Sequence, residues 1–129
     1  MTRKKVFKPT DSELAILRVL WERGPSTVRE VQEEMEKSRK TGYTTALKFL
    51  QIMTEKELVR RDDRQRAHVY EAAYTEEQTQ KQLVGDLLER AFGGSAMKLV
   101  VQALDAKKAT PEELAEIREL LEEQGSTDR

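Results

Sequence analysis

A predicted helix over residues 43–56 carries a polar face whose side chains can bind DNA. Two hydroxyls, an amide, a cation and a phenol lie on or beside that face, at Tyr43, Thr44, Thr45, Lys48 and Gln51. Hydroxyls and amides can read base edges in the major groove, whereas lysine more often attracts phosphate. Taken alone, the pattern is more typical of a solvated helix face, so its surroundings decide between the two interpretations.

Basic residues flank this helix on both sides. Lys40 follows Lys37 and Arg39 just before it. Four arginines fall within seven residues after it, at Arg60, Arg61, Arg64 and Arg66. Each cation that neutralises a phosphate releases counterions, so DNA affinity should fall steeply with salt. Asp62 and Asp63 partly offset this charge, and pairing of Arg60 and Arg61 with acidic neighbours is the alternative.

Three predicted helices and a hairpin would position this basic surface. The helices are expected over 11–23, 28–37 and 43–56, and extended segments over 58–61 and 67–74. Capping boxes, in which a Thr hydroxyl and a side chain three residues later satisfy free N–H groups, mark helix starts at Thr10, Thr27, Thr75 and Thr110. Three helices followed by a hairpin is the order of a winged helix-turn-helix, whose last helix enters the groove. We therefore predict a DNA-binding domain over residues 1–74.

The remaining residues, 75–129, are predicted to form a helical dimerisation domain, which makes the fold mainly α. Helices are expected over 76–92, 96–104 and 111–124, followed by a frayed tail over 125–129. The apolar side chains expected at the dimer contact are Leu83, Leu87, Leu88, Phe92, Leu99, Val100, Leu104, Leu114, Ile117 and Leu121. So short a segment buries too little apolar surface alone, and a second copy would cover it. Packing of these helices onto the front domain of a monomer is the alternative.

Composition narrows the class of protein. Of 129 residues, 36% are charged and none is cysteine, so disulfides and cysteine-based zinc sites are excluded. Residues 1–74 hold 16 Lys/Arg and 12 Asp/Glu, whereas residues 75–129 hold 7 and 12, which suggests that the front meets a polyanion. No run can span a bilayer, and the basic N-terminus lacks the apolar stretch of a signal peptide. We expect a cytoplasmic protein.

Enzymatic chemistry is not expected. His68 is the single histidine and lies in the predicted hairpin, without partners for a nucleophile triad or a metal site. Gly93-Gly94 lacks the preceding strand and wider motif of a phosphate-binding loop. We predict no cofactor and no metal. A winged helix that binds only proteins is the other non-enzymatic alternative, and the basic hairpin argues against it.

Several stretches of the chain resemble the BlaI/MecI/CopY family, the penicillinase repressors. The likeness covers about residues 8–123 and is carried by the order of Thr10–Leu14, Leu20–Glu22, Tyr43–Leu47, Glu55–Arg61, Phe92–Gly94, Leu99-Val100, Glu113-Leu114 and Leu120-Leu121. The resemblance implies a homodimeric repressor on a dyad-symmetric operator with TACA/TGTA-like half-sites. It also implies control of genes for β-lactamases, other cell-wall or stress functions, or metal handling.

The resemblance further implies how repression ends. In the antibiotic branch of the family, a membrane metallopeptidase sensor signals β-lactam and the repressor is cleaved at an Asn–Phe bond. The matching place in this chain holds Gln102-Ala103. The copper branch uses a cysteine metal hook, which a chain without cysteine excludes.

Overall fold

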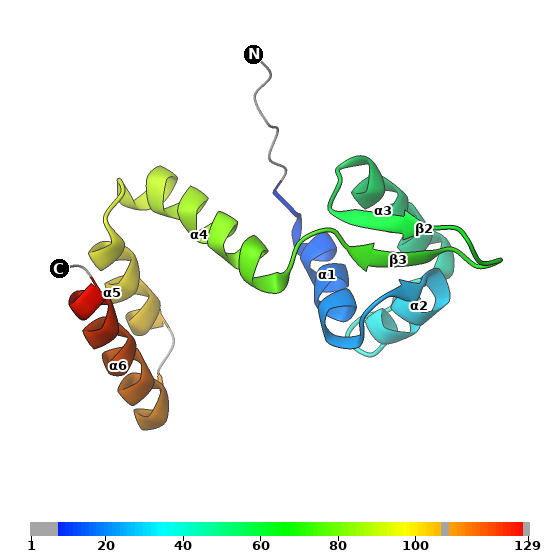
Figure 1. Cartoon of the computed structure of the whole chain (residues 1–129). Helices are drawn as coiled ribbons and strands as arrows, with labels where there is room; N and C mark the ends of the chain where they lie inside the picture. Colours follow the sequence, from blue (N-terminus) through cyan, green and yellow to red (C-terminus); the bar gives the residue numbers. More distant parts are fainter. Residues whose placement is uncertain (1–7, 107–108, 128–129) are drawn as a thin grey trace, which may run out of the picture. The chain divides into compact units, whose positions relative to one another are not determined.

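The computed structural model describes residues 8–106 and 109–127, which form two compact units (Figure 1): a front unit that ends at Leu83 and a rear unit that begins at Val84. The elements of the described residues are α1 (Asp11–Arg23), β1 (Ser26–Thr27), α2 (Val28–Glu36), α3 (Tyr43–Glu55), β2 (Val59–Asp62), β3 (Val69–Ala72), α4 (Glu76–Phe92), α5 (Ala96–Ala106) and α6 (Pro111–Thr127). The winged helix-turn-helix order and the mainly helical fold are therefore confirmed. The functional division at residues 74 and 75 stays a prediction.

All four predicted capping boxes are present. At the start of α1, the Thr10 hydroxyl accepts from the Glu13 backbone N–H at 3.2 Å, and the Glu13 carboxylate accepts from the Thr10 N–H at 2.9 Å. The same reciprocal pair occurs at Thr27, Thr75 and Thr110. Each box satisfies donors that the first helical turn leaves free, which is why α1 and α4 begin where the sequence predicts.

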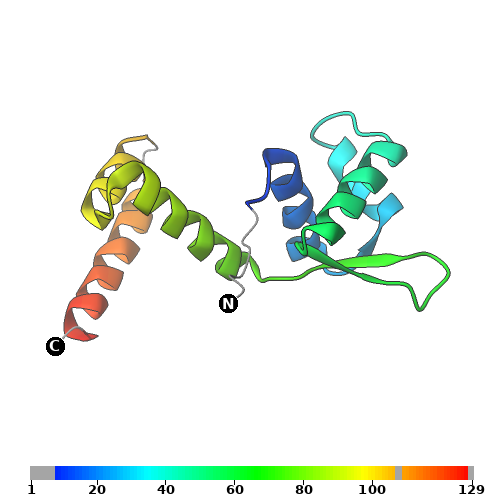
Figure 2. The same ribbon diagram turned by 90° about the horizontal axis from the view of Figure 1, so that it is seen from above.

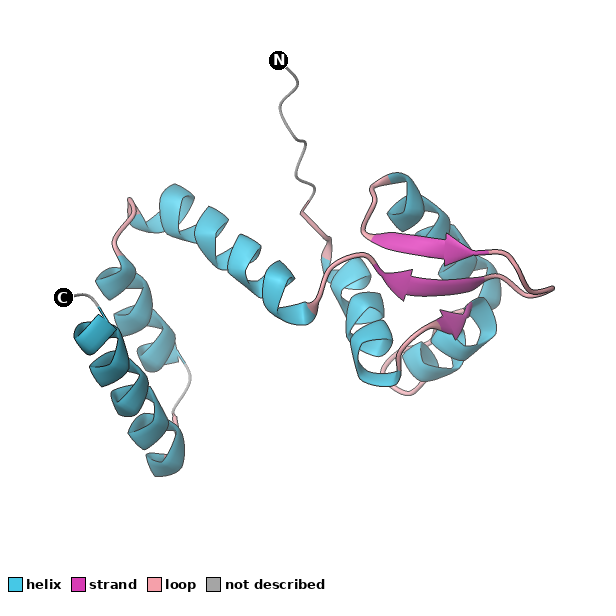
Figure 3. Cartoon of the chain, viewed as in Figure 1, coloured by secondary structure: helices cyan, strands magenta, loops and turns pink. Residues whose placement is uncertain are grey.

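Strands β2 and β3 form the wing hairpin, whose turn projects beyond the helices of the front unit (Figure 2). Together with β1 they make one antiparallel sheet in the order β1-β3-β2 (Figure 3). Strand β1 was not predicted, because two residues are too few to show an alternating pattern. It pairs Ser26 with Tyr70 and thereby attaches the wing to the segment between α1 and α2.

Twelve apolar side chains of the front unit make one core between the three helices and the sheet. They include Ile16, Leu17 and Leu20 of α1, whereas Leu14 and Trp21 pack against this core and are half-buried. Trp21 is instead held at its polar end, where its indole N–H donates to the Tyr74 carbonyl at 3.0 Å. The front unit can therefore position a surface without help from other segments.

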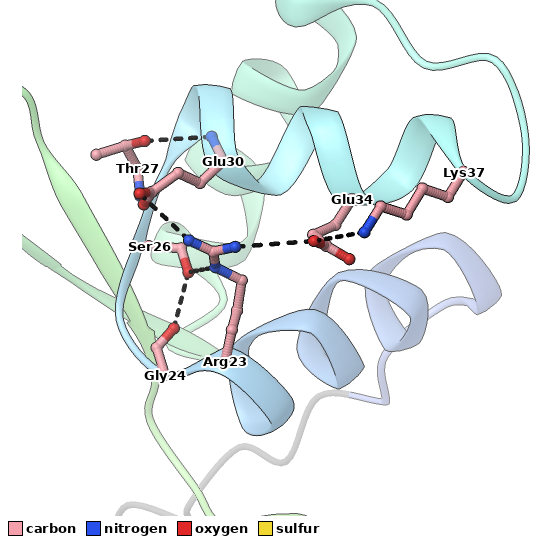
Figure 4. Close-up of polar contacts among 7 residues, drawn as sticks. All are labelled: Arg23, Gly24, Ser26, Thr27, Glu30, Glu34 and Lys37. Atoms are coloured by element: carbon pink, nitrogen blue, oxygen red, sulfur yellow. Dashed lines mark hydrogen bonds and ion pairs between the residues drawn. The ribbon is translucent and has the colours of Figure 1, made fainter.

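Polar contacts fix α2 against the end of α1 (Figure 4). The Arg23 guanidinium lies 3.2 Å from the Glu30 carboxylate and 3.7 Å from that of Glu34, and its Nε donates to the Ser26 hydroxyl at 3.1 Å. The N–H of Thr27 and the charge of Arg23 outweigh desolvation and lower the pKa of Glu30. One arginine thus spans two turns of α2.

A partly buried ion pair joins α1 to the end of α3. The Lys56 ammonium lies 2.9 Å and 3.1 Å from the two carboxylate oxygens of Glu13. Glu13 is 2% exposed, so its charge requires both this partner and the Thr10 N–H. The pair holds the C-terminal end of α3 in place.

The rear unit has a different character, because no side chain described within 84–125 is buried. Large apolar side chains lie exposed on all three helices, among them Leu87, Val100 and Leu120. The predicted fraying over 125–129 is wrong for its first part, since α6 continues to Thr127, and residues 128 and 129 lie outside the described residues. No described helix is long and apolar enough to cross a membrane.

Candidate nucleic-acid interface

Helix α3 has one buried face and one polar face. Ala46, Leu50 and Met53 are fully buried against the core, because they recur at helical spacing. The five side chains predicted to bind DNA all lie exposed, at Tyr43, Thr44, Thr45, Lys48 and Gln51. The fold thus leaves hydroxyl, amide and cationic groups together on one accessible surface.

The turn before α3 is tied down by side chains of α2. The buried Thr41 donates its backbone N–H to the Glu36 carboxylate at 2.8 Å and accepts at its carbonyl from the Gln32 amide at 3.0 Å. These bonds fix the chain one residue before Gly42, the N-cap of α3. Helix α3 therefore starts from a rigid turn.

The cations before α3 differ in their surroundings. Arg39 donates to the Ser12 hydroxyl of α1 at 2.6 Å, which directs it toward the protein. Lys40 is exposed and makes no ion pair with any described residue. A hydroxyl does not neutralise Arg39, so both residues keep their charge, and of the two only Arg39 has its side chain directed by a described contact.

The arginines of the wing differ in whether they form an ion pair with an acidic side chain. Arg64 forms a close pair with Asp62, at 2.7 Å, and its side chain and backbone N–H together hold the pKa of Asp62 at about 2. Arg61 lies 3.4 Å from Asp63, and Arg60 lies 3.9 Å from Glu71. The pairing that the sequence left open for Arg60 and Arg61 is therefore present. Arg66 makes no ion pair within the described part of the chain.

Two further candidate residues were missed by the sequence analysis. Arg29 of α2 and His68 of the wing line a surface depression together with Tyr43 and Arg66. The Arg29 guanidinium lies over the Tyr43 ring, 5.4 Å from its centroid. Nothing in the residue pattern brings Arg29 near the wing, because the tertiary fold creates this proximity. His68 itself is exposed, and the described residues contain no cluster of His, Cys, Asp and Glu that could hold a metal ion.

The side chains predicted to form the dimer contact are incompletely covered within their own units. Half of them lie exposed, namely Leu87, Val100, Leu104, Leu114 and Leu121. The other half are partly buried, namely Leu83, Leu88, Phe92, Leu99 and Ile117. These residues still present apolar surface to solvent.

Comparison with known proteins gives a consistent result. The family model for the penicillinase repressor matches residues 9–123. The "Transcriptional regulator BlaI" of Mycobacterium tuberculosis, matched in two strains, is 34% identical over 88 residues, which are 67% of this chain and 64% of that protein. The chain thus matches slightly less than two thirds of the length of these relatives. The "Penicillinase repressor" of Bacillus licheniformis is 24% identical over 120 residues, covering 93% of this chain and 94% of that protein.

A solved structure shares the fold of part of the chain. It is the solution structure of the monomeric form of BlaI from Bacillus licheniformis in complex with the blaP half-operator. It matches with a TM-score of 0.50 and 24% identity, over 58% of this chain and 92% of that one. The relatives carry the names of regulators and repressors, in agreement with the expectation that this chain is not an enzyme. With the family model matched over nearly its whole length, the chain belongs to the penicillinase repressor family.

Proposed function

We propose that the protein is a DNA-binding transcriptional repressor that acts as a homodimer on a dyad-symmetric operator with TACA/TGTA-like half-sites. The observation that carries this proposal is the division of α3 into two faces. Ala46 and Leu50 anchor the helix in the core, while Thr45, Lys48 and Gln51 are exposed beside them. A helix so anchored can enter the major groove and present those groups to base edges.

Family membership supports the DNA partner. The Bacillus licheniformis BlaI structure is described as a complex with a half-operator, and its fold matches 58% of this chain. A half-operator is one arm of a two-armed site, which two copies of a repressor would occupy together. The operator sequence and the regulated genes, which the family resemblance places among β-lactamase, cell-wall, stress or metal-handling genes, belong to the proposal.

The rear of the chain supports the homodimer. Its three helices leave large apolar side chains exposed, including Val100 and Leu121. Several large apolar side chains exposed on a small helical segment are typical of an interface. We assign DNA binding to residues 1–74 and dimerisation to residues 75–129, and we place the protein in the cytoplasm, where its DNA partner is found.

A membrane metallopeptidase sensor, implied by the family resemblance, stays a prediction. Its cleavage site would fall near Gln102-Ala103, on the exposed surface of α5. Mass spectrometry of the protein after co-expression with a metallopeptidase encoded beside it would detect a cut there. An intact chain under inducing conditions would contradict this mode of release.

The proposed function is tested by measuring binding to a palindromic TACA/TGTA duplex and to a scrambled duplex of equal length. Gln51→Ala should weaken operator binding by about 1–3 kcal/mol and relax sequence preference, because its amide is assigned to a base edge. Lys48→Ala should weaken binding to both duplexes and reduce the salt slope by about 1. Both variants should keep the melting temperature, since both side chains are exposed.

The matched control is Lys81→Ala, which removes an exposed lysine of α4. It should leave both affinities nearly unchanged. If the unaltered protein binds neither duplex, the protein-interaction alternative replaces the proposed function. Equal binding to the palindrome and the scrambled duplex would contradict sequence-specific repression.

A further inference from the structure

The arginines of α2 and the wing fall into two groups according to their neighbours. Arg60, Arg61 and Arg64 each lie within 4.0 Å of a carboxylate, and the closest pair joins Arg64 to Asp62 at 2.7 Å. Arg29 and Arg66 form no ion pair with any residue that the structure describes. A paired arginine has little net charge to offer a phosphate, so the strongest attraction should come from the unpaired group.

Arg29 and Arg66 line the same depression. It has a volume of about 440 Å³, and its polar or aromatic lining consists of Thr27, Arg29, Tyr43, Arg66, His68 and Tyr70. These residues come from the start of α2, the start of α3 and the wing. No described Asp or Glu is part of the lining. The depression is therefore cationic and contains several hydrogen-bond donors.

Local contacts explain why Arg29 keeps its charge available. The neighbouring Glu30 carboxylate accepts from the Thr27 N–H at 2.9 Å and pairs with Arg23 at 3.2 Å, so it is directed toward α1 (Figure 4). The Arg29 guanidinium instead lies over the Tyr43 ring, where a cation–π contact restrains it without neutralising it. Its N–H donors can therefore bind an anion that enters the depression.

We propose that this depression binds a phosphate group of the DNA backbone beside the groove that α3 enters. Arg29 and Arg66 donate to the phosphate oxygens, and Tyr43 is a positioning residue that holds Arg29 in place. Arginine suits this role because its planar fork matches phosphate oxygens. The backbone contact thus comes mainly from the base of the wing and the start of α2, and less from Arg60, Arg61 and Arg64. This inference rests on the proposed function.

The first test is the salt dependence of operator binding by the full chain. Arg29→Gln and Arg66→Gln should each weaken binding to operator and scrambled duplex alike. Each should also lower the magnitude of the slope of log K against log salt, by about 0.9 for each phosphate that the variant no longer neutralises. The matched control, Lys81→Gln, removes one positive charge from an exposed side chain that does not line the depression, and it should leave the slope nearly unchanged. Equal melting temperatures would show that all variants fold.

Tyr43 is tested by a double-mutant cycle. Tyr43→Leu should reduce the slope only in part, and Arg29→Gln added to it should have a smaller further effect than Arg29→Gln alone. Arg29→Lys should restore the slope, because the charge is kept. Additive effects of the two substitutions would overturn the positioning role of Tyr43.

A second test distinguishes backbone phosphate from a free phosphate ligand. A duplex with one neutral methylphosphonate at the contacted position should bind the unaltered protein more weakly than the normal duplex does. The Arg29→Gln variant should bind these two duplexes with equal affinity. Inorganic phosphate at millimolar concentration should not produce a saturable shift of the His68 ring resonances in the DNA-free protein. A saturable shift would overturn the assignment to DNA in favour of a free phosphate ligand.

The two proposals fail in different ways. If the unaltered protein binds no duplex, the proposed function fails. If it prefers its operator while Arg29→Gln and Arg66→Gln keep the full salt slope, the phosphate site is overturned and the repressor function stands.

Discussion

The front and rear units contain similar kinds of apolar residue but bury them to different extents. In the front unit, twelve apolar side chains are buried in one core, and Leu50 is 0% exposed. In the described part of the rear unit, nine large apolar side chains are exposed, and Leu120 is 60% exposed. The difference is what we expect if the front unit is complete as a single chain and a second copy covers the rear unit, as proposed.

The two units also differ in how far their polar contacts are buried. The front unit pairs its buried carboxylate, Glu13, with Lys56 and ties Thr41 to Glu36. The polar contacts described for the rear unit are exposed, such as the pair of Arg90 with Asp86 at 3.6 Å. Firm positioning of side chains is therefore a property of the front unit, where the proposed DNA surface lies.

The largest expected effect is the disruption of the dimer. Val100→Asp puts a charge into the surface that a second copy is proposed to cover, and an unpaired buried charge is strongly unfavourable. We expect monomers, and operator binding weaker by about 10²–10⁴-fold because the two half-sites are no longer bound together. Light scattering and titration of the palindromic duplex measure both effects. A dimer that persists in this variant would contradict the comparison between the units.

The same substitution in the two units should have unequal effects on stability. Leu50→Ala empties space in a closed core and should cost about 2–5 kcal/mol of unfolding free energy. Leu120→Ala should cost less than about 0.5 kcal/mol at concentrations too low for dimers to form, because its side chain meets solvent in the single chain. Urea unfolding followed by circular dichroism at matched protein concentrations measures the difference. Equal losses at every concentration would mean that the rear unit has a core of its own.

The smallest expected effect concerns the wing. The pKa of Asp62 is lowered from 3.8 to about 2, first by its hydrogen bond with the Arg64 side chain. Since the folded pKa is the lower one, the stabilisation is complete above pH 3.8 and is lost as pH falls toward about 2. The carboxyl carbon resonance of Asp62 should titrate with a midpoint near 2. A midpoint at the ordinary value of 3.8 would mean that Arg64 is free to bind phosphate.

Much of the fold follows from local signals in the sequence. Capping boxes at Thr10 and Thr75 fix the starts of α1 and α4, and the helical period of Ala46, Leu50 and Met53 identifies the buried face of α3. These features depend on residues a few positions apart, so a sequence contains all the information needed to find them.

The features that escaped prediction depend on residues far apart in the chain. Strand β1 exists because β3 offers Ser26 and Thr27 a hydrogen-bonding edge. The depression beside the wing exists because the fold brings Arg29 to Arg66 and His68. Likewise, the sequence shows the wing arginines but leaves open which of them are neutralised by carboxylates.

The central claim is that two copies of the chain hold two α3 helices on one operator, and the number of chains per duplex tests it most directly. Sedimentation velocity of the full chain with a fluorescent duplex should show two chains on a duplex with both half-sites. Val100→Asp should bind a single half-site as one chain. One chain at saturation on the complete palindrome, or no complex at all, would contradict the account.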